Sequence, residues 1–233
     1  MGLRRGWSRR RAVCAAMLLV PALGSRIAAE PTEPAAPPLR PNFRELAKAS
    51  GEPQIPGLTI VYLHPLGSPA DANEWQNIIL HQTEGPAGSA KSAAMAQAKN
   101  PTKRGVMLWV ETDGTVYWAT AENVITTHGD GANRNDNKYI DNSITYRRVI
   151  KTNSIGIELV GNYPDVTRPA TPEQVRALLQ LVRLLQERYD IPADHIYAHN
   201  WIDYKDRRYC EGCDLALLAR RLGYVPGKRA SGE

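Results

Sequence analysis

The hydrophobic positions of this chain fall into short runs that are separated by polar and alanine-rich stretches. Six runs are short enough to be strands: 59–63, 78–80, 106–110, 115–118, 155–160 and 195–199. Longer stretches with helical character lie between and after them. This alternation predicts an α/β fold with a mixed central β-sheet flanked by helices.

A local turn signal defines one pair of strands. Thr112, Asp113 and Gly114 separate the apolar run at 106–110 from a second run at 115–118. Two apolar runs joined by such a turn are typical of a β-hairpin, so we expect these two strands to be antiparallel neighbours.

The clearest helix is predicted to begin after Thr171. Pro172 suits the first helical position, and Gln174 completes a capping box with Thr171. Apolar residues then recur at helical spacing and form one stripe that would face the sheet: Val175, Leu178, Leu179, Val182, Leu185 and Tyr189. Two further helices are predicted, over the alanine-rich stretch 88–100 and over 215–222.

The N-terminus has the pattern of an export signal over residues 1–29. Five arginines precede an apolar stretch at 12–23, which is too short for a stable membrane anchor but typical of a signal-peptide core. Cleavage fits after Gly24 or after Ala29. The arginines at 9–11 leave a twin-arginine signal open beside a general secretory signal, and a basic amphipathic or uncleaved anchor is the third alternative. We therefore expect a periplasmic protein without stable membrane insertion after signal removal, with secretion beyond the periplasm as the alternative.

Composition and charge narrow the class of protein. The chain is 42% hydrophobic and 23% charged, which excludes collagen, a disulfide-dense miniprotein and a wholly disordered chain. The net charge of +5 comes from the N-terminus, because residues 1–29 hold six arginines and no acidic residue. The remainder holds 23 basic and 24 acidic residues, a net charge of −1. A nucleic-acid partner, which requires a basic patch on the folded domain, is therefore not expected.

Proline-rich sequence separates the export signal from the rest of the chain. Five prolines lie within 30–41, which predicts an extended linker over 30–49. The strands and helices that follow are expected to form one domain over 50–225, with a polar tail at 226–233. A monomer is the default expectation.

Three residues stand where a metal centre would require them. His81 and His199 each end a predicted strand, and Cys210 follows in a polar loop. Two imidazoles and one thiolate would provide three protein ligands and leave a fourth position open, as in catalytic zinc sites. The alternative interpretation is that both histidines are hydrogen-bonded surface residues, a common role at strand ends.

Four stretches around these residues carry a more specific signal. They lie at 79–85, 113–117, 153–161 and 198–215, and the third, Asn-Ser-Ile-Gly-Ile-Glu-Leu-Val-Gly, is the most distinctive. In this order they resemble zinc-dependent N-acetylmuramoyl-L-alanine amidases of type 2, a family that includes phage lysozyme-type amidases and the peptidoglycan recognition proteins. The resemblance covers about residues 76–223. It implies the fold of that family, a peptidoglycan or muropeptide substrate and one catalytic zinc ion.

The resemblance also implies a role for each matching residue. His81 and His199 match the two histidine ligands, and Cys210 matches the third ligand of the cysteine branch. Glu158 matches the glutamate that serves some branches as general base for the attacking water. Arg208 stands where many members carry a lysine that stabilises the oxyanion, and Arg207 or Lys205 is the alternative for this role.

Other positions extend the family pattern or depart from it. His128 falls where the family often has a histidine beside the cleft, so we expect it to contact substrate; a loop histidine without a special role is the alternative. Val106 and Met107 occupy the place where several members carry a tyrosine, so Glu158 is expected to act as the base alone. Cys213 could form a disulfide with the predicted cysteine ligand, which would remove that ligand, or could pack as a small apolar side chain.

These expectations combine into one leading hypothesis and one alternative. The leading hypothesis is an exported zinc hydrolase that cleaves the amide bond between N-acetylmuramic acid and L-alanine. Its substrate would be intact wall or soluble muropeptides, with or without a 1,6-anhydro sugar. The alternative is a peptidoglycan-binding module on the same fold without catalysis. A zinc peptidase has no support, because the chain contains no His-Glu-x-x-His motif.

Overall fold

The computed structural model describes residues 41–129, 143–161, 164–203 and 209–222. The expected export signal with its cleavage sites, the polar tail and Arg208 lie outside the described residues. None of the helices within these ranges is long and apolar enough to cross a membrane.

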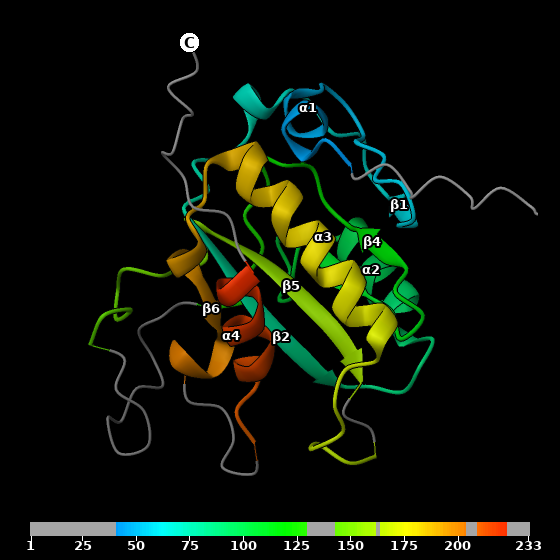
Figure 1. Cartoon of the computed structure of the whole chain (residues 1–233), viewed down its shortest axis with the longest axis vertical. Coiled ribbons are helices and arrows are strands. Elements are labelled where there is room, and N and C mark those ends of the chain that lie inside the picture. The colour runs from blue at the N-terminus through cyan, green and yellow to red at the C-terminus, as the bar shows by residue number, and fades with distance from the viewer. Residues whose placement is uncertain (1–40, 130–142, 162–163, 204–208, 223–233) are drawn as a thin grey trace, which may run out of the picture. The chain divides into compact units, whose positions relative to one another are not determined.

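A sheet of six strands organises the described residues (Figure 1). In spatial order the strands are β1 (Ile60–Tyr62), β4 (Val116–Trp118), β3 (Leu108–Val110), β5 (Ser154–Gly161), β2 (Asn77–Glu84) and β6 (Ile196–Ala198). β3 and β4 pair antiparallel and form the hairpin predicted around 112–114, whereas each of the other neighbouring pairs is parallel. The sheet is therefore mixed, which confirms the predicted fold class.

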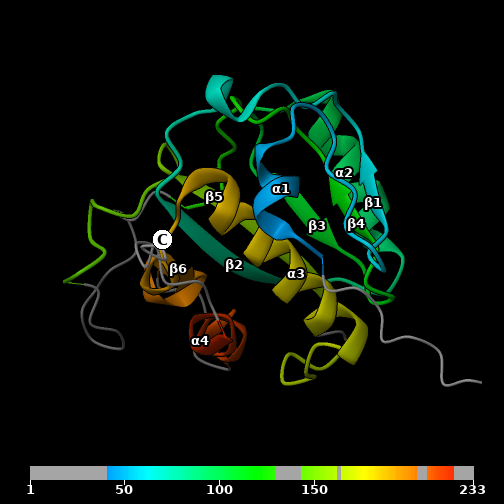
Figure 2. The same ribbon diagram turned by 45° about the horizontal axis from the view of Figure 1, so that its top comes forward.

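Helices cover both faces of the sheet (Figure 1 and Figure 2). α3 (Pro172–Tyr189) crosses one face, with α1 (Phe43–Lys48) and α4 (Cys213–Leu222) on the same side, and α2 (Ser89–Lys99) lies on the opposite side. Three short 3₁₀ helices complete the described elements: η1 (Pro69–Asp71), η2 (Ala193–His195) and η3 (His199–Trp201).

The main hydrophobic core lies between α3 and the sheet. Successive residues of a strand point to opposite faces, and Ile78 and Leu80 of β2 point toward α3, where they pack in one cluster with Leu178. Ile79 and His81 alternate with these residues and point to the opposite face of the sheet. Ile79 accordingly belongs to a second, smaller cluster, and His81 shares its face of the sheet. The chemistry of the site is therefore separated from the main core by the sheet itself.

α3 begins where the sequence predicts. Thr171 and Gln174 form the capping box, since each side chain accepts a hydrogen bond from the other residue's main-chain N–H. The Gln174 amide also donates to the carbonyl oxygens of Val110 and Val160, at 3.3 and 2.6 Å. These bonds fix the start of α3 against both β3 and β5.

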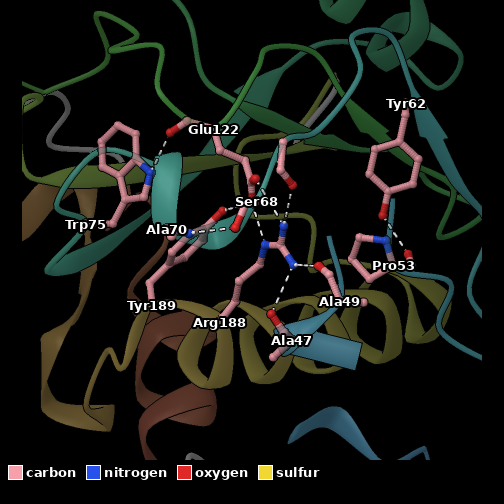
Figure 3. Close-up of polar contacts among 11 residues, drawn as sticks. Ala47, Ala49, Pro53, Tyr62, Ser68, Ala70, Trp75, Glu122, Arg188 and Tyr189 are labelled. Carbon is pink, nitrogen blue, oxygen red and sulfur yellow. Dashed lines mark hydrogen bonds and ion pairs between the residues drawn. The ribbon is translucent and has the colours of Figure 1, made fainter. Parts of the chain in front are cut away.

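The start of the folded domain differs from the expected one. Residues 43–48, which the sequence places in the linker, form α1, and Ala47 is buried. The guanidinium of Arg188 in α3 holds this helix, because it donates to the carbonyl oxygens of Ala47 and Ala49 at 3.0 and 2.8 Å and pairs with buried Glu122 (Figure 3). A six-residue helix is too short to show a periodic pattern, which explains why the sequence does not reveal it.

Candidate metal centre and active site

Two buried histidines meet at the carboxyl-terminal edge of the sheet. His81 lies in the second half of β2, and His199 directly follows β6, which pairs parallel with β2. The carboxyl ends of parallel strands share one edge, and ligands usually bind there. The two ring centroids are 4.3 Å apart, and His81 and His199 are only 3% and 7% exposed.

The Glu211 carboxylate joins the two histidines. Its Oε1 atom lies 3.5 Å from Nδ1 of His81, and its Oε2 atom lies 3.1 Å from Nδ1 of His199. The main-chain N–H of Gln82 donates to Oε1 at 3.3 Å. Glu211 is buried, and one ligand atom from each of the three residues lies within 4.8 Å of the others. His81, His199 and Glu211 therefore form a group that could hold a metal ion.

Burial and the neighbouring imidazoles act in opposite directions on Glu211. Burial raises the pKa of its carboxyl group, whereas hydrogen bonds from His199 and His81 and the positive charge of these rings lower the pKa. The lowering dominates. The carboxyl group consequently stays ionised, as a ligand for a cation must be.

The loop before α4 sets the direction of the Glu211 side chain. Gly212 adopts a φ of +79°, and a Cβ atom there would lie 2.3 Å from the carbonyl oxygen of Leu80. The Gly212 N–H donates to Oε1 of Gln82 at 3.0 Å. Glycine suits both the positive φ and the close approach to β2, so the loop lies against that strand with Glu211 facing the histidines.

Cys210, the third ligand that the resemblance implies, is not among the residues that meet here. The structure joins its sulfur to that of Cys213 in a disulfide and leaves Cys210 exposed. A disulfide sulfur offers no thiolate to a metal ion. The neighbouring Glu211 occupies the inward position instead, so a carboxylate lies beside the two histidines where the resemblance implies a thiolate.

Glu158 lies beside the centre on the next strand. In the register of β2 and β5 it pairs with His81, and because neighbouring strands lie about 4.8 Å apart, the two side chains leave the same face of the sheet side by side. Trp109 of β3 pairs with Glu158 on its other side, and the Glu158 side chain is half-buried. This position is compatible with the predicted role as general base, which stays a prediction.

His128 lies behind His81, away from open surface. Its Nδ1 atom is 3.2 Å from Nε2 of His81, and its Nε2 atom is 3.1 Å from the carbonyl oxygen of Ser154. Burial, together with the charge of His81 and His199, lowers the pKa of His128 to about 3, so the ring is neutral. The structure thus engages both ring nitrogens within the protein, and the predicted contact with substrate stays a prediction.

Two polar residues near the centre could not be predicted from the sequence. Asp203 is buried, and its Oδ2 atom lies 3.7 Å from Nε2 of His199. The Tyr209 hydroxyl donates to the carbonyl oxygen of Gln82 at 3.5 Å. Both residues lie in irregular segments without periodicity. The sequence offers one signal for Asp203: it follows His199 by four residues, and one helical turn brings residues at that spacing close together.

The donor set suits a zinc ion. Two imidazole nitrogens and one carboxylate oxygen are a ligand set of catalytic zinc sites. One ligand atom from each of the three residues lies within 4.8 Å of the others, so the three could converge on one ion. The residues present therefore fit one such ion.

Fold and site together define an α/β protein with a candidate metal centre at the carboxyl-terminal edge of a mixed sheet. The family model described as N-acetylmuramoyl-L-alanine amidase matches residues 71–213, a range that includes both histidines, Glu158 and Glu211. The chain belongs to this family, and it is an amidase of the class that acts on peptidoglycan.

Several solved structures are similar to this chain at low sequence identity. The endolysin N-acetylmuramoyl-L-alanine amidase LysCS from Clostridium intestinale URNW is 16% identical, with a TM-score of 0.47 over 73% of this chain and 99% of its own. An AmpD derivative is 18% identical, with a TM-score of 0.48 over 71% and 96%. The catalytic domain of XlyA is 20% identical, with a TM-score of 0.45 over 65% and 87%. No curated protein matches the chain, so membership of the family rests on the family model.

Proposed function

We propose that this chain is an exported, zinc-dependent amidase that hydrolyses the bond between the lactyl group of N-acetylmuramic acid and the L-alanine of the stem peptide. The observation that carries the proposal is the convergence of His81, His199 and Glu211 at one edge of the sheet, with Glu158 on the neighbouring strand. Membership of the family supplies the substrate class.

His81, His199 and Glu211 would hold the ion through two imidazole nitrogens and one carboxylate. Zinc held there would polarise the scissile carbonyl and lower the pKa of a water molecule to about 7. The three side chains come from β2, from the segment after β6 and from the loop before α4. The site is thus a product of the tertiary fold.

Glu158 would act as the general base. Its carboxylate accepts a proton from the attacking water, whose oxygen forms the new bond to the amide carbon. The carboxyl group then donates this proton to the amide nitrogen as the C–N bond breaks, which yields a lactyl carboxylate and the free amino group of L-alanine. Arg208, outside the described residues, is proposed to stabilise the oxyanion through its permanent positive charge.

The substitution Glu158→Gln tests this division of roles. We expect turnover to fall about 10²–10⁴-fold, the usual contribution of general acid–base catalysis. Zinc content should stay at one ion per chain, because the ligands are unchanged. Elemental analysis and mass spectrometry of muropeptide products measure the two quantities. Loss of zinc would show that Glu158 supports the site structurally, and unchanged turnover would remove it from the reaction.

Export is a separable part of the proposal. The N-terminal arginines and the apolar stretch at 12–23 support it. Fractionation of cells that carry the chain with a C-terminal tag should find it in the periplasm, shortened near Gly24 or Ala29. A full-length product in the cytoplasm would contradict export and leave the amidase reaction unaffected.

A further inference from the structure

An exposed group of apolar, aromatic and basic side chains lies beside the centre and takes no part in the reaction proposed above. Ile144 is 73% exposed and Tyr146 is 39% exposed, and Arg147 and Arg148 are exposed next to them. These four residues form the Tyr–Arg surface. Tyrosine and arginine are the residue types that protein surfaces use most often to contact partners, so this surface is a candidate binding site.

The segment that carries the Tyr–Arg surface is fixed to both strands of the centre. The Thr145 hydroxyl donates at 3.0 Å to the carbonyl oxygen of Trp201 in η3, the 3₁₀ helix that begins at the second candidate histidine ligand. Val149 packs in one cluster with Ile79, which precedes His81 by two residues and shares its face of β2. The surface is therefore held close to the centre, on the side of the sheet where His81 lies.

A turn presents these side chains to solvent. The N–H groups of Arg148 and Val149 both donate to the carbonyl oxygen of Thr145 at 2.9 Å. Within the turn Arg147 adopts a φ of +57°, a left-handed conformation that is uncommon for residues other than glycine. Thr145 and Val149 are buried at the two ends of the turn, and the residues between them are exposed. The interior contacts thus fix the turn and leave its outer side chains available.

The Tyr–Arg surface is positively charged, unlike the rest of the chain beyond the N-terminus. Residues 143–153 hold three basic residues and no acidic one, whereas residues 30–233 have a net charge of −1. Within the described ranges no ion pair joins Arg147 or Arg148 to a carboxylate. The Arg147 guanidinium lies 5.2 Å from the centroid of the Tyr146 ring. A carboxylate of a ligand can pair with the guanidinium, and an apolar sugar face can pack on the ring.

We propose that the Tyr–Arg surface binds a second unit of polymeric peptidoglycan while the centre holds the unit to be cleaved, so that the wall polymer is the preferred substrate. Repeating sugars and stem-peptide carboxylates complement the ring and the two guanidinium groups. Once one unit is bound, binding of the next becomes intramolecular, which raises the affinity without any new contact at the centre. A single muropeptide lacks the second unit. The choice of peptidoglycan rests on the proposed function, whereas binding at this surface does not require cleavage.

Two matched double substitutions test the surface in the full chain. Arg147→Gln with Arg148→Gln removes both of its charges. Arg44→Gln with Lys48→Gln is the control, because these exposed residues lie on α1, at the other face of the sheet. Affinity is measured by cosedimentation with insoluble peptidoglycan, in chains that also carry Glu158→Gln so that the polymer is not degraded. Vesicles of phosphatidylcholine with phosphatidylglycerol test an anionic membrane as the partner, and circular dichroism verifies folding.

We expect the surface variant to bind insoluble peptidoglycan about tenfold more weakly, because the intramolecular second contact is lost. The control variant should stay within about twofold, since exposed charges away from the site contribute little. Added salt should weaken binding of the parent chain and narrow the difference between the variants. In chains that retain Glu158, the ratio of turnover on polymer to turnover on a soluble monomeric muropeptide should fall about tenfold in the surface variant alone.

Three contrary results separate this proposal from the proposed function. Equal binding by the two variants would overturn the proposal. Binding to anionic vesicles with none to peptidoglycan would also overturn it, in favour of a membrane surface as the partner. A chain that binds peptidoglycan through Arg147 and Arg148 but cleaves no muropeptide would contradict the proposed function alone, because the binding measurement needs no turnover.

Discussion

At the scale of single residues, the loop before α4 places three consecutive residues in three different environments. Cys210 is exposed and bonded to Cys213, Glu211 is buried against two histidines, and Gly212 lies against the backbone of β2. A Cβ atom on residue 212 would lie 2.3 Å from the carbonyl oxygen of Leu80, so the loop could not keep this path with a larger residue there. The candidate third donor of the centre is therefore set by the path of the backbone as much as by the residue types in the loop.

The substitution Glu211→Gln distinguishes the carboxylate from the thiolate as third donor. We expect it to weaken zinc binding by more than about 100-fold, since loss of a ligand should exceed the 10–100-fold cost of losing an outer partner. The matched variant, Cys210→Ser with Cys213→Ser, should retain one zinc ion per chain. Elemental analysis of both purified variants is the measurement. Zinc loss confined to the cysteine variant would restore Cys210 as the ligand.

Some of these residues could be predicted from the sequence and others could not. His81 and His199 could be found because each ends an apolar run, and the carboxyl ends of parallel strands gather at one edge. Glu158 stands out as a single charge within an apolar run. Glu211 could not be found, because the choice between it and the preceding cysteine depends on the positive φ of Gly212. That angle accompanies the close approach of Gly212 to β2, a contact between segments far apart in the sequence.

At the scale of elements, Arg188 near the end of α3 holds separate segments together. Its guanidinium donates to the carbonyl oxygens of Ala47 and Ala49 at the end of α1 and pairs with Glu122 (Figure 3). The Tyr189 hydroxyl donates to the same carboxylate. Both charged side chains are buried, so loss of one partner would leave the other charge in the interior without compensation.

The substitution Arg188→Met tests the contribution of this buried pair. We expect the free energy of unfolding to fall by about 3–5 kcal/mol, the usual cost of breaking a buried pair. Arg176→Met on the same helix is the matched control, because its ion pair with Glu173 is exposed and contributes less than about 1 kcal/mol. Urea unfolding measures both variants. Equal losses in the two would show that the environment of Arg188 in solution differs from the one described.

The elements could be predicted to the extent that local signals define them. The capping box at Thr171 and the turn at 112–114 correctly located α3 and the β3–β4 hairpin. The strand expected at 195–199 is shorter, because both of its terminal histidines belong to 3₁₀ turns. α1 could not be foreseen, since the interaction that stabilises it comes from Arg188, far along the chain.

At the scale of the whole molecule, the parallel strands bring together residues that are remote in sequence. Gln82 and Glu211 are bonded across 129 positions of the chain, and both belong to the segments that form the centre. A ligand set assembled from such distant segments exists only in the folded chain. Metal binding should therefore stabilise the folded chain in addition to its proposed role in the reaction.

Zinc should accordingly raise the melting temperature. At a free zinc concentration of about 100 times Kd, binding contributes about 2.7 kcal/mol, which corresponds to about 5–11 °C in Tm for a domain of this size. His199→Ala should abolish the shift, whereas His195→Ala should retain it, because His195 bonds to the Gln76 carbonyl oxygen outside the centre. Thermal melts with zinc and with a chelator are the measurement. A full shift in His199→Ala would place the ion elsewhere.

The central claim is that this centre cleaves the amide bond next to L-alanine, and one measurement tests it most directly. Muropeptides are incubated with the full chain, with and without a chelator, and the products are weighed by mass spectrometry. We predict separate sugar and intact stem peptide, lost on chelation and restored by zinc. Unchanged muropeptides from a folded, zinc-loaded chain would contradict the claim and favour a peptidoglycan-binding module without catalysis.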